Sequence, residues 1–132
     1  MPPIRGARRN QLNATEIAIA AARAASEKIA TDVVVLEVGD IIGITEAFVL
    51  ASGSNTRQVR AICDEIEFAL KVEADVSPRS TEGLSDASWV LMDYGMVVVH
   101  VFLDETREYY DLERLWSDAP RVDWEPDRRA VS

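Results

Sequence analysis

The sequence predicts a single α/β (α+β) domain in which helices pack against a mixed sheet of four or five strands. Its length of 132 residues, with 48% hydrophobic and 28% charged residues, is typical of one globular domain. Short β-branched runs alternate along the chain with segments whose apolar residues recur at helical spacing. Two of these runs lie on either side of a tight turn, which indicates a hairpin within the sheet.

The N-terminal part begins with a predicted helix over residues 14–30. Asn13, followed three residues later by Glu16, forms a capping box, and the alanine-rich stretch after it has helical spacing. Two strands are predicted next, over residues 33–36 and 47–51, because both runs are apolar and too short for helices.

A second helix is predicted over residues 55–72, with Ser54 as its N-cap. The apolar residues expected on its buried face are Val59, Ile62, Ile66 and Leu70. Residues 73–86 are polar and contain Pro78, which disfavours a central strand but allows an edge strand.

A β-hairpin is predicted next, with strands over residues 88–92 and 96–102 and a turn at 93–95. A last helix follows over residues 104–116, with Asp104 as its N-cap. The apolar stripe expected on this helix consists of Tyr109, Leu112, Leu115 and Trp116. The predicted element order is therefore α-β-β-α-(β)-β-β-α.

The domain is expected to cover residues 13–117. Residues 1–12 are expected to form a flexible basic head, and residues 118–132 a charged tail that is at best loosely docked. No apolar run approaches the roughly 20 residues that span a bilayer, and no secretory signal is recognised. The single cysteine, Cys63, cannot form an internal disulfide, so a cytoplasmic setting without a membrane is expected.

The charge of the chain limits the kinds of partner that it can bind. The net charge is −9, and residues 32–118 alone contain 18 acidic and 6 basic residues. A surface this acidic repels phosphate backbones, so direct sequence-specific binding to nucleic acid is disfavoured. A basic protein partner is compatible with it, although acidity also serves solubility alone.

His100, the only histidine, lies in a valine-rich run and is interpreted as a structural residue with a hydrogen-bonded ring. A catalytic histidine would need an oriented nucleophile or carboxylate, and Ser52 and Asp93 are candidates by residue type alone. Cys63 is expected to be buried in the second helix. One cysteine and one histidine are too few ligands for a zinc site, so no metal or cofactor is predicted.

The alternative to a binding protein is a metal-dependent nucleotidyltransferase or another nucleotide-binding enzyme. Ser52-Gly53-Ser54 follows a strand and precedes a helix, where backbone N–H groups can cradle an anion. Such transferases hold two metals with a pair of carboxylates on the next strand. The nearest acidic pair here, Glu65 and Glu67, lies in mid-helix, where side chains two residues apart diverge. No catalytic residues are therefore predicted.

Aromatic and acidic residues gather on the hairpin and the last helix. On the hairpin they are Trp89, Asp93 and Tyr94, beside Gly95, and on the helix they are Tyr109, Tyr110 and Trp116. Aromatic side chains next to acidic ones are typical of the centre of a protein interface. Tyr109 and Trp116 are nevertheless expected in the core, whereas Tyr94 lies in a turn and is expected to be exposed.

These residues resemble the ribosomal silencing factor family, also called RsfS or Iojap. The resemblance is carried by W-V-L-M-D-Y-G-M-V-V-V-H-V-F at 89–102, by Arg107-x-x-Tyr110-Asp111-Leu112-Glu113-x-Leu115-Trp116, by A-S-G-S-N-T-R-Q-V at 51–59, and by Glu82-Gly83. Together these motifs span about residues 15–117 in the family's order and spacing, and the head and tail lie outside them.

The resemblance implies a nucleotidyltransferase-like fold without transferase activity. It implies binding to a basic protein of the large ribosomal subunit, the fourteenth in the large-subunit numbering, at the intersubunit face. Binding there would block subunit joining and repress translation under nutrient limitation. The resemblance also implies that the free protein can pair as a homodimer.

Carried over by position, the expected partner-binding residues are Trp89, Asp93, Tyr94, Gly95, Met96, Tyr110 and Glu113. Met96 stands where many family members have Asp. This difference removes one negative charge from the expected contact with a basic partner.

Overall fold

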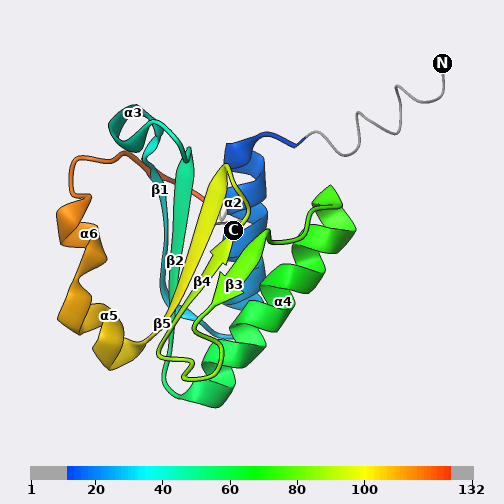
Figure 1. Ribbon diagram of the computed structural model, residues 1–132, viewed down its shortest axis with the longest axis vertical. Coiled ribbons are helices and arrows are strands. Elements are labelled where there is room, and N and C mark those ends of the chain that lie inside the picture. The colour runs from blue at the N-terminus through cyan, green and yellow to red at the C-terminus, as the bar shows by residue number, and fades with distance from the viewer. Residues whose placement is uncertain (1–11, 126–132) are drawn as a thin grey trace, which may run out of the picture.

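A computed structural model describes residues 12–125 as a six-stranded mixed sheet with helices on both faces (Figure 1). The strands are β1 (Thr31–Glu37), β2 (Ala47–Gly53), β3 (Ser80–Glu82), β4 (Trp89–Asp93), β5 (Val97–Leu103) and β6 (Arg121–Val122). The helices are α2 (Ala14–Glu27), α3 (Gly39–Ile42), α4 (Thr56–Ala74), α5 (Asp104–Tyr110) and α6 (Leu112–Leu115). The strand order is β3-β4-β5-β2-β1-β6, with β2 and β5 parallel and the other neighbours antiparallel. The predicted α/β class and mixed sheet are confirmed, including an edge strand at β3.

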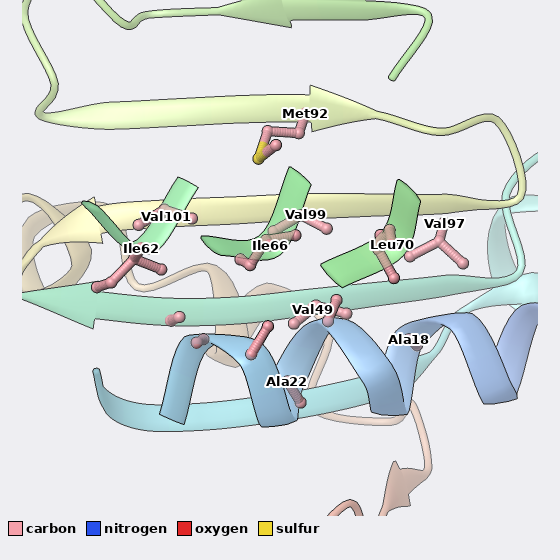
Figure 2. Packing of buried hydrophobic residues seen from close by; sticks show 14 of the residues in the cluster. Ala18, Ala22, Val49, Ile62, Ile66, Leu70, Met92, Val97, Val99 and Val101 are labelled. Atoms are coloured by element: carbon pink, nitrogen blue, oxygen red, sulfur yellow. The ribbon is translucent and has the colours of Figure 1, made fainter. Parts of the chain in front are cut away.

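Helices α2 and α4 lie side by side against one face of the sheet (Figure 1). The predicted apolar face of α4 is confirmed, since Val59, Ile62, Ile66 and Leu70 are all fully buried. Figure 2 shows α4 packed against the valines of β5, and the alanines of α2 next to Val49 of β2. Alanine side chains on α2 are small, so the helix backbone lies close to the sheet.

The residues of β5 alternate between the two faces of the sheet, as the period of a strand requires. Val97, Val99 and Val101 belong to the core beneath α2 and α4. Val98, His100 and Phe102 point to the opposite face, where Phe102 joins a second, smaller core cluster with Phe48. The sheet therefore separates two cores of different size.

The N-terminal caps of the helices agree only partly with the predictions. The capping box of α2 is confirmed, because the Glu16 N–H donates to Asn13 Oδ1 over 2.8 Å and the Asn13 N–H to Glu16 Oε1 over 2.9 Å. The N-cap of α4 is Asn55 rather than Ser54, since its Oδ1 accepts the third N–H of the helix. Helix α5 starts after Leu103, so Asp104 is its first residue and makes no side-chain cap.

The last predicted helix is two short helices. Asp111 adopts a left-handed conformation with φ of 48°, which ends α5 and begins α6. This break interrupts the helical spacing, so the predicted apolar stripe is wrong for Tyr109 and Leu115, which are 81% and 72% exposed. Leu112 and Trp116 do pack against the smaller core, partly buried.

Residues 118–125 are part of the fold, contrary to the expected loosely docked tail over 118–132, whose last residues, 126–132, lie outside the described part of the chain. The Glu37 N–H donates to the Pro120 carbonyl over 2.8 Å, and β6 continues this pairing as a sixth strand at the edge of β1. The Trp124 indole N–H donates to the Val33 carbonyl over 2.9 Å. The exposed backbone groups on the edge of β1 are therefore hydrogen-bonded to residues 120–124. The charged composition of this part of the chain gave no sign of that pairing.

The expected basic head lies outside the described residues, except for Leu12, which packs against the larger core. Among residues 12–125, none of the helices has both the length and the apolar character needed to cross a membrane.

Candidate partner-binding surface

Trp89 and Tyr110 form the exposed end of an aromatic cluster on the α5 side of the sheet. The ring centroid of Trp89, at the start of β4, lies 4.9 Å from that of Tyr110 and 5.0 Å from that of Phe102. Tyr110 is 54% exposed, whereas Trp89 is half-buried. Two predicted site residues from distant parts of the chain therefore meet at the surface.

His100 is buried behind Trp89, as a structural histidine with a hydrogen-bonded ring was expected to be. The Trp89 indole N–H donates to His100 Nδ1 over 3.2 Å. Burial lowers the pKa of His100 to about 4, so the ring is neutral at pH 7. The two candidate catalytic partners bond elsewhere, Asp93 to the Gly95 N–H and Ser52 to Arg107.

Asp93 and Gly95 shape the turn of the hairpin. The Gly95 N–H donates to Asp93 Oδ1 over 2.8 Å, and Arg79 Nη2 lies 3.4 Å from Asp93 Oδ2. Gly95 has a φ of 88°, a conformation that residues with a Cβ rarely adopt. The Asp93 carboxylate is partly exposed, so it holds the turn and still contributes negative charge to the surface.

Tyr94 turns inward, so its expected exposure is wrong. Its ring packs against the larger core, and its hydroxyl is buried without a hydrogen-bond partner among the described residues. Burial raises the pKa of Tyr94, with smaller contributions from the charge of Glu67 and from Cys63. The strand alternation persists into the turn, which places Tyr94 on the same side as the buried Met92. Tyr94 is therefore not part of the surface that carries Trp89.

Cys63 on α4 is buried, as predicted. Burial raises the pKa of the Cys63 thiol to about 12, so the sulfur stays protonated and unreactive at neutral pH.

Glu113 is engaged in an ion-pair network within the fold. Its two carboxylate oxygens lie 3.1 Å from Nε and Nη2 of Arg107, which is only 6% exposed. Arg121 approaches the same carboxylate at 3.6 Å and so ties β6 to α6. Glu113 therefore holds α5, α6 and β6 together, and its contact with a partner stays a prediction.

Three residues that were not among the predicted partner-binding residues lie on the same face of the sheet as Trp89: Glu82, Leu91 and Val98. Leu91 is paired with His100 of β5 and with Glu82 of β3, so their side chains share one face of the sheet. Val98 lies opposite Asp93 on this same face. Leu91 and Val98 are only half-buried, and Glu82 is exposed. The alternation of Trp89, Leu91 and Asp93 along β4 was a signal that could have found Leu91, whereas Val98 and Glu82 are placed by the pairing between strands.

We define the β4 face as the surface formed by Glu82, Trp89, Leu91, Asp93, Val98 and Tyr110. It combines half-exposed apolar groups with two carboxylates at its margin. Met96, which is 44% exposed, lies at the nearby end of the hairpin.

The expected anion cradle at Ser52-Gly53-Ser54 is filled by a side chain of the protein itself. Gln58 Oε1 accepts the Ser54 N–H over 2.8 Å and lies 3.1 Å from the Ser54 hydroxyl. The Gln58 amide nitrogen donates to the carbonyls of Lys28 and Ile29. A phosphate would have to displace this bridged amide from the N–H that it occupies.

A cavity of about 630 Å³ beside Ser52 has a strongly acidic lining. The acidic residues that line it are Asp32, Asp104, Glu108, Asp111 and Glu113. Arg107, the cation in this lining, is already paired with Glu113. Such a lining opposes the binding of a nucleoside triphosphate. Within residues 12–125, no group of three or more His, Cys, Asp or Glu side chains is arranged to hold a metal ion.

Comparison with known proteins gives a consistent result. Residues 11–132 match the family model described as "Ribosomal silencing factor during starvation". The chain belongs to the ribosomal silencing factor family. The family match extends to the C-terminus, so the expectation that the segment after residue 117 lies outside it is wrong.

Individual relatives agree with this family assignment. The chain is 40% identical to ribosomal silencing factor RsfS of Bacillus subtilis over 115 residues, which cover 85% of this chain and 94% of that protein. It is 34% identical to the mouse protein named mitochondrial assembly of ribosomal large subunit protein 1, over 67% of this chain and 40% of that protein. A crystal structure of a Chromobacterium violaceum protein superposes with a TM-score of 0.76 at 35% identity, covering 80% of this chain and 88% of that one.

Proposed function

We propose that this protein binds the large ribosomal subunit through the β4 face, contacts the basic fourteenth protein of that subunit, and blocks joining of the small subunit. Membership of the ribosomal silencing factor family supports the ribosome as the target. The charge of the chain supports a basic contact, because residues 32–118 carry 18 acidic and 6 basic residues.

The observation that carries the choice of surface is the Trp89–Tyr110 pair. Tyr110 is 54% exposed although its ring contacts Trp89, and Leu91 beside them is also left half-buried. Half-exposed aromatic side chains that are already ordered by stacking lose little conformational entropy when they bind a partner. The carboxylates of Glu82 and Asp93 lie on the same face, where they favour a basic partner.

We infer that the protein acts by binding rather than by catalysis. The filled cradle at Ser54 and the acidic cavity beside Ser52 support this inference, because both disfavour a bound nucleotide. A nucleotidyltransferase activity is therefore not proposed.

Substitution of Tyr110 by Ala tests the proposed surface. We expect a roughly 30-fold or greater loss of affinity for purified large subunits, as is usual for an aromatic anchor. Phe68→Ala is the matched control, because Phe68 is 65% exposed but lies on α4, on the opposite face of the sheet. Co-sedimentation with large subunits at several protein concentrations measures both affinities. Equal binding of the folded Tyr110→Ala variant and the wild type would contradict the proposed surface.

The block of subunit joining needs a separate measurement. We expect the wild-type protein to reduce the fraction of joined ribosomes formed from purified subunits, and Tyr110→Ala to reduce it much less. Joined ribosomes that form normally while the protein stays bound to the large subunit would contradict the block. The homodimer implied for the free protein stays a prediction, which sedimentation equilibrium of the isolated protein tests.

A further inference from the structure

The contact between Trp89 and His100 is a polar bond inside an aromatic cluster. The two nitrogen atoms lie 3.2 Å apart, and His100 is only 5% exposed. The imidazole is enclosed by Phe48, whose ring centroid is 4.8 Å away, and by Phe102, stacked at 6.1 Å. Burial among aromatic rings leaves the imidazole little freedom to change its orientation.

The bond determines which nitrogen of His100 carries the proton. An indole N–H can only donate, so His100 Nδ1 must be unprotonated to accept from Trp89. The neutral ring therefore carries its proton on Nε2. That nitrogen is buried and has no hydrogen-bond partner among the described residues. An unpaired buried N–H is unfavourable for folding, so the fold alone does not explain a histidine at this position.

The same contact connects the core to the surface. Trp89 lies between the buried His100 and the exposed Tyr110, whose ring centroid is 4.9 Å from that of Trp89. A half-buried tryptophan on a strand has several rotamers, and a directional hydrogen bond selects one of them. Because the Tyr110 ring packs against the indole, the orientation of the indole in turn determines the position of the Tyr110 ring.

We propose that His100 is a positioning residue for partner binding, whose Nε2-protonated ring fixes the indole of Trp89 and thereby the place of Tyr110 on the β4 face. This role rests on the proposed function of that face. His100 itself does not touch the partner, because it is buried behind Trp89.

Two substitutions of His100 separate positioning from simple space filling. His100→Asn keeps an acceptor, because the Asn amide oxygen takes the place of Nδ1 relative to the backbone. His100→Leu has no acceptor. We expect His100→Leu to weaken binding to purified large subunits about tenfold, and His100→Asn to stay within about threefold of the wild type. Both affinities are measured on samples whose folding is confirmed by circular dichroism.

A double-substitution cycle with Trp89→Phe provides the second readout, because Phe keeps a ring but has no N–H. If His100 acts through the indole, His100→Leu has almost no further effect on binding in the Trp89→Phe background. Equal tenfold losses in both backgrounds, or a folded His100→Leu variant that binds like the wild type, would overturn the proposal.

The ring resonances of the ¹⁵N-labelled protein report the positioning directly. We expect the His100 spectrum of the Nε2-protonated tautomer. We also expect the Trp89 indole N–H resonance to shift upfield in His100→Leu, where its hydrogen bond is lost, and to stay close to the wild-type position in His100→Asn, which keeps an acceptor. An Nδ1-protonated ring would overturn the proposal. If the His100 and Trp89 resonances behave as expected but Tyr110→Ala binds large subunits like the wild type, the proposed surface is wrong while the His100–Trp89 contact is right.

Discussion

The two faces of the sheet are built differently. Beneath α2 and α4 the side chains are apolar and almost all fully buried, as Ile66 and Val99 are. On the face that carries α5 and α6, a buried histidine, a buried arginine and half-exposed aromatic rings take the place of a continuous apolar layer. The first face thus holds the larger of the two apolar cores, and the second face holds a smaller one around Leu50 and Phe102. The second contains polar groups whose geometry is fixed by specific bonds, which is what a binding surface needs.

The largest expected effect on stability is on the α2/α4 side. Ile66→Ala removes a fully buried side chain and leaves a cavity, so the free energy of unfolding should fall by about 2–5 kcal/mol. Leu115→Ala on α6 is the matched control, because Leu115 is 72% exposed and its loss should change stability by less than about 0.5 kcal/mol. Urea denaturation measures both. Similar losses for the two variants would contradict the burial of Ile66 beneath the sheet.

The ion pair on the other face gives the next largest effect. Glu113→Gln leaves the buried Arg107 without a compensating charge, so unfolding should become easier by about 2 kcal/mol, less than for a fully buried pair. Asp75→Asn, which breaks the exposed pair with Lys71, should cost less than about 0.5 kcal/mol. Thermal denaturation compares the two. A folded Glu113→Gln variant of unchanged stability that has lost large-subunit binding would show that Glu113 serves contact alone.

A smaller effect of opposite sign is expected at Tyr94. Tyr94→Phe removes a buried hydroxyl that has no partner within residues 12–125, so stability should rise by about 1 kcal/mol while partner binding is unchanged. Because burial raises the pKa of Tyr94 in the folded state, the unfolded chain loses this proton first as the pH rises. The advantage of Tyr94→Phe should therefore grow above about pH 10. Urea midpoints at pH 7 and above pH 10 measure this, and a destabilised variant at pH 7 would show that the Tyr94 hydroxyl does have a hydrogen-bond partner.

The smallest expected effect is on association with the partner. Glu82→Gln should slow association with large subunits about threefold at low salt, and hardly at all at high salt, because it lies at the margin of the β4 face. Glu73→Gln on α4 is the control for total charge, since it lies on the opposite side of the sheet. Stopped-flow kinetics at two salt concentrations would detect the difference, and identical rates for both variants would remove Glu82 from the contact.

The two faces also differ in how far the sequence predicts them. The α4 residues that face the sheet follow from spacing alone, because an apolar stripe of regular period has one way to be buried. The break at Asp111 does not follow, since its left-handed backbone leaves no signal in the apolar pattern around it. Strand β6 was missed for a related reason, because two residues in a charged segment are too few to show strand alternation.

The sequence also predicts only part of the candidate site, because it shows residue types but not how the helices cover the sheet. The pairing of Trp89 with Tyr110 agrees with their selection from the aromatic pattern, but the inward turn of Tyr94 contradicts an exposure inferred from its place in a turn. Leu91 and Val98 look like ordinary strand residues in the sequence. Their partial exposure depends on how far α5 and α6 cover the sheet, which is a property of the tertiary structure.

Oxidative footprinting of side chains, with and without purified large subunits, tests the central claim most directly. Hydroxyl radicals modify exposed aromatic and sulfur-containing side chains, so the method compares Tyr110 and Met96 near the β4 face with Phe68 on α4 in a single sample. We expect large subunits to protect Tyr110 and Met96 and to leave the modification of Phe68 unchanged. Protection of Phe68 with unchanged modification of Tyr110 would contradict the account, because it would place the ribosome on the α2/α4 side of the protein.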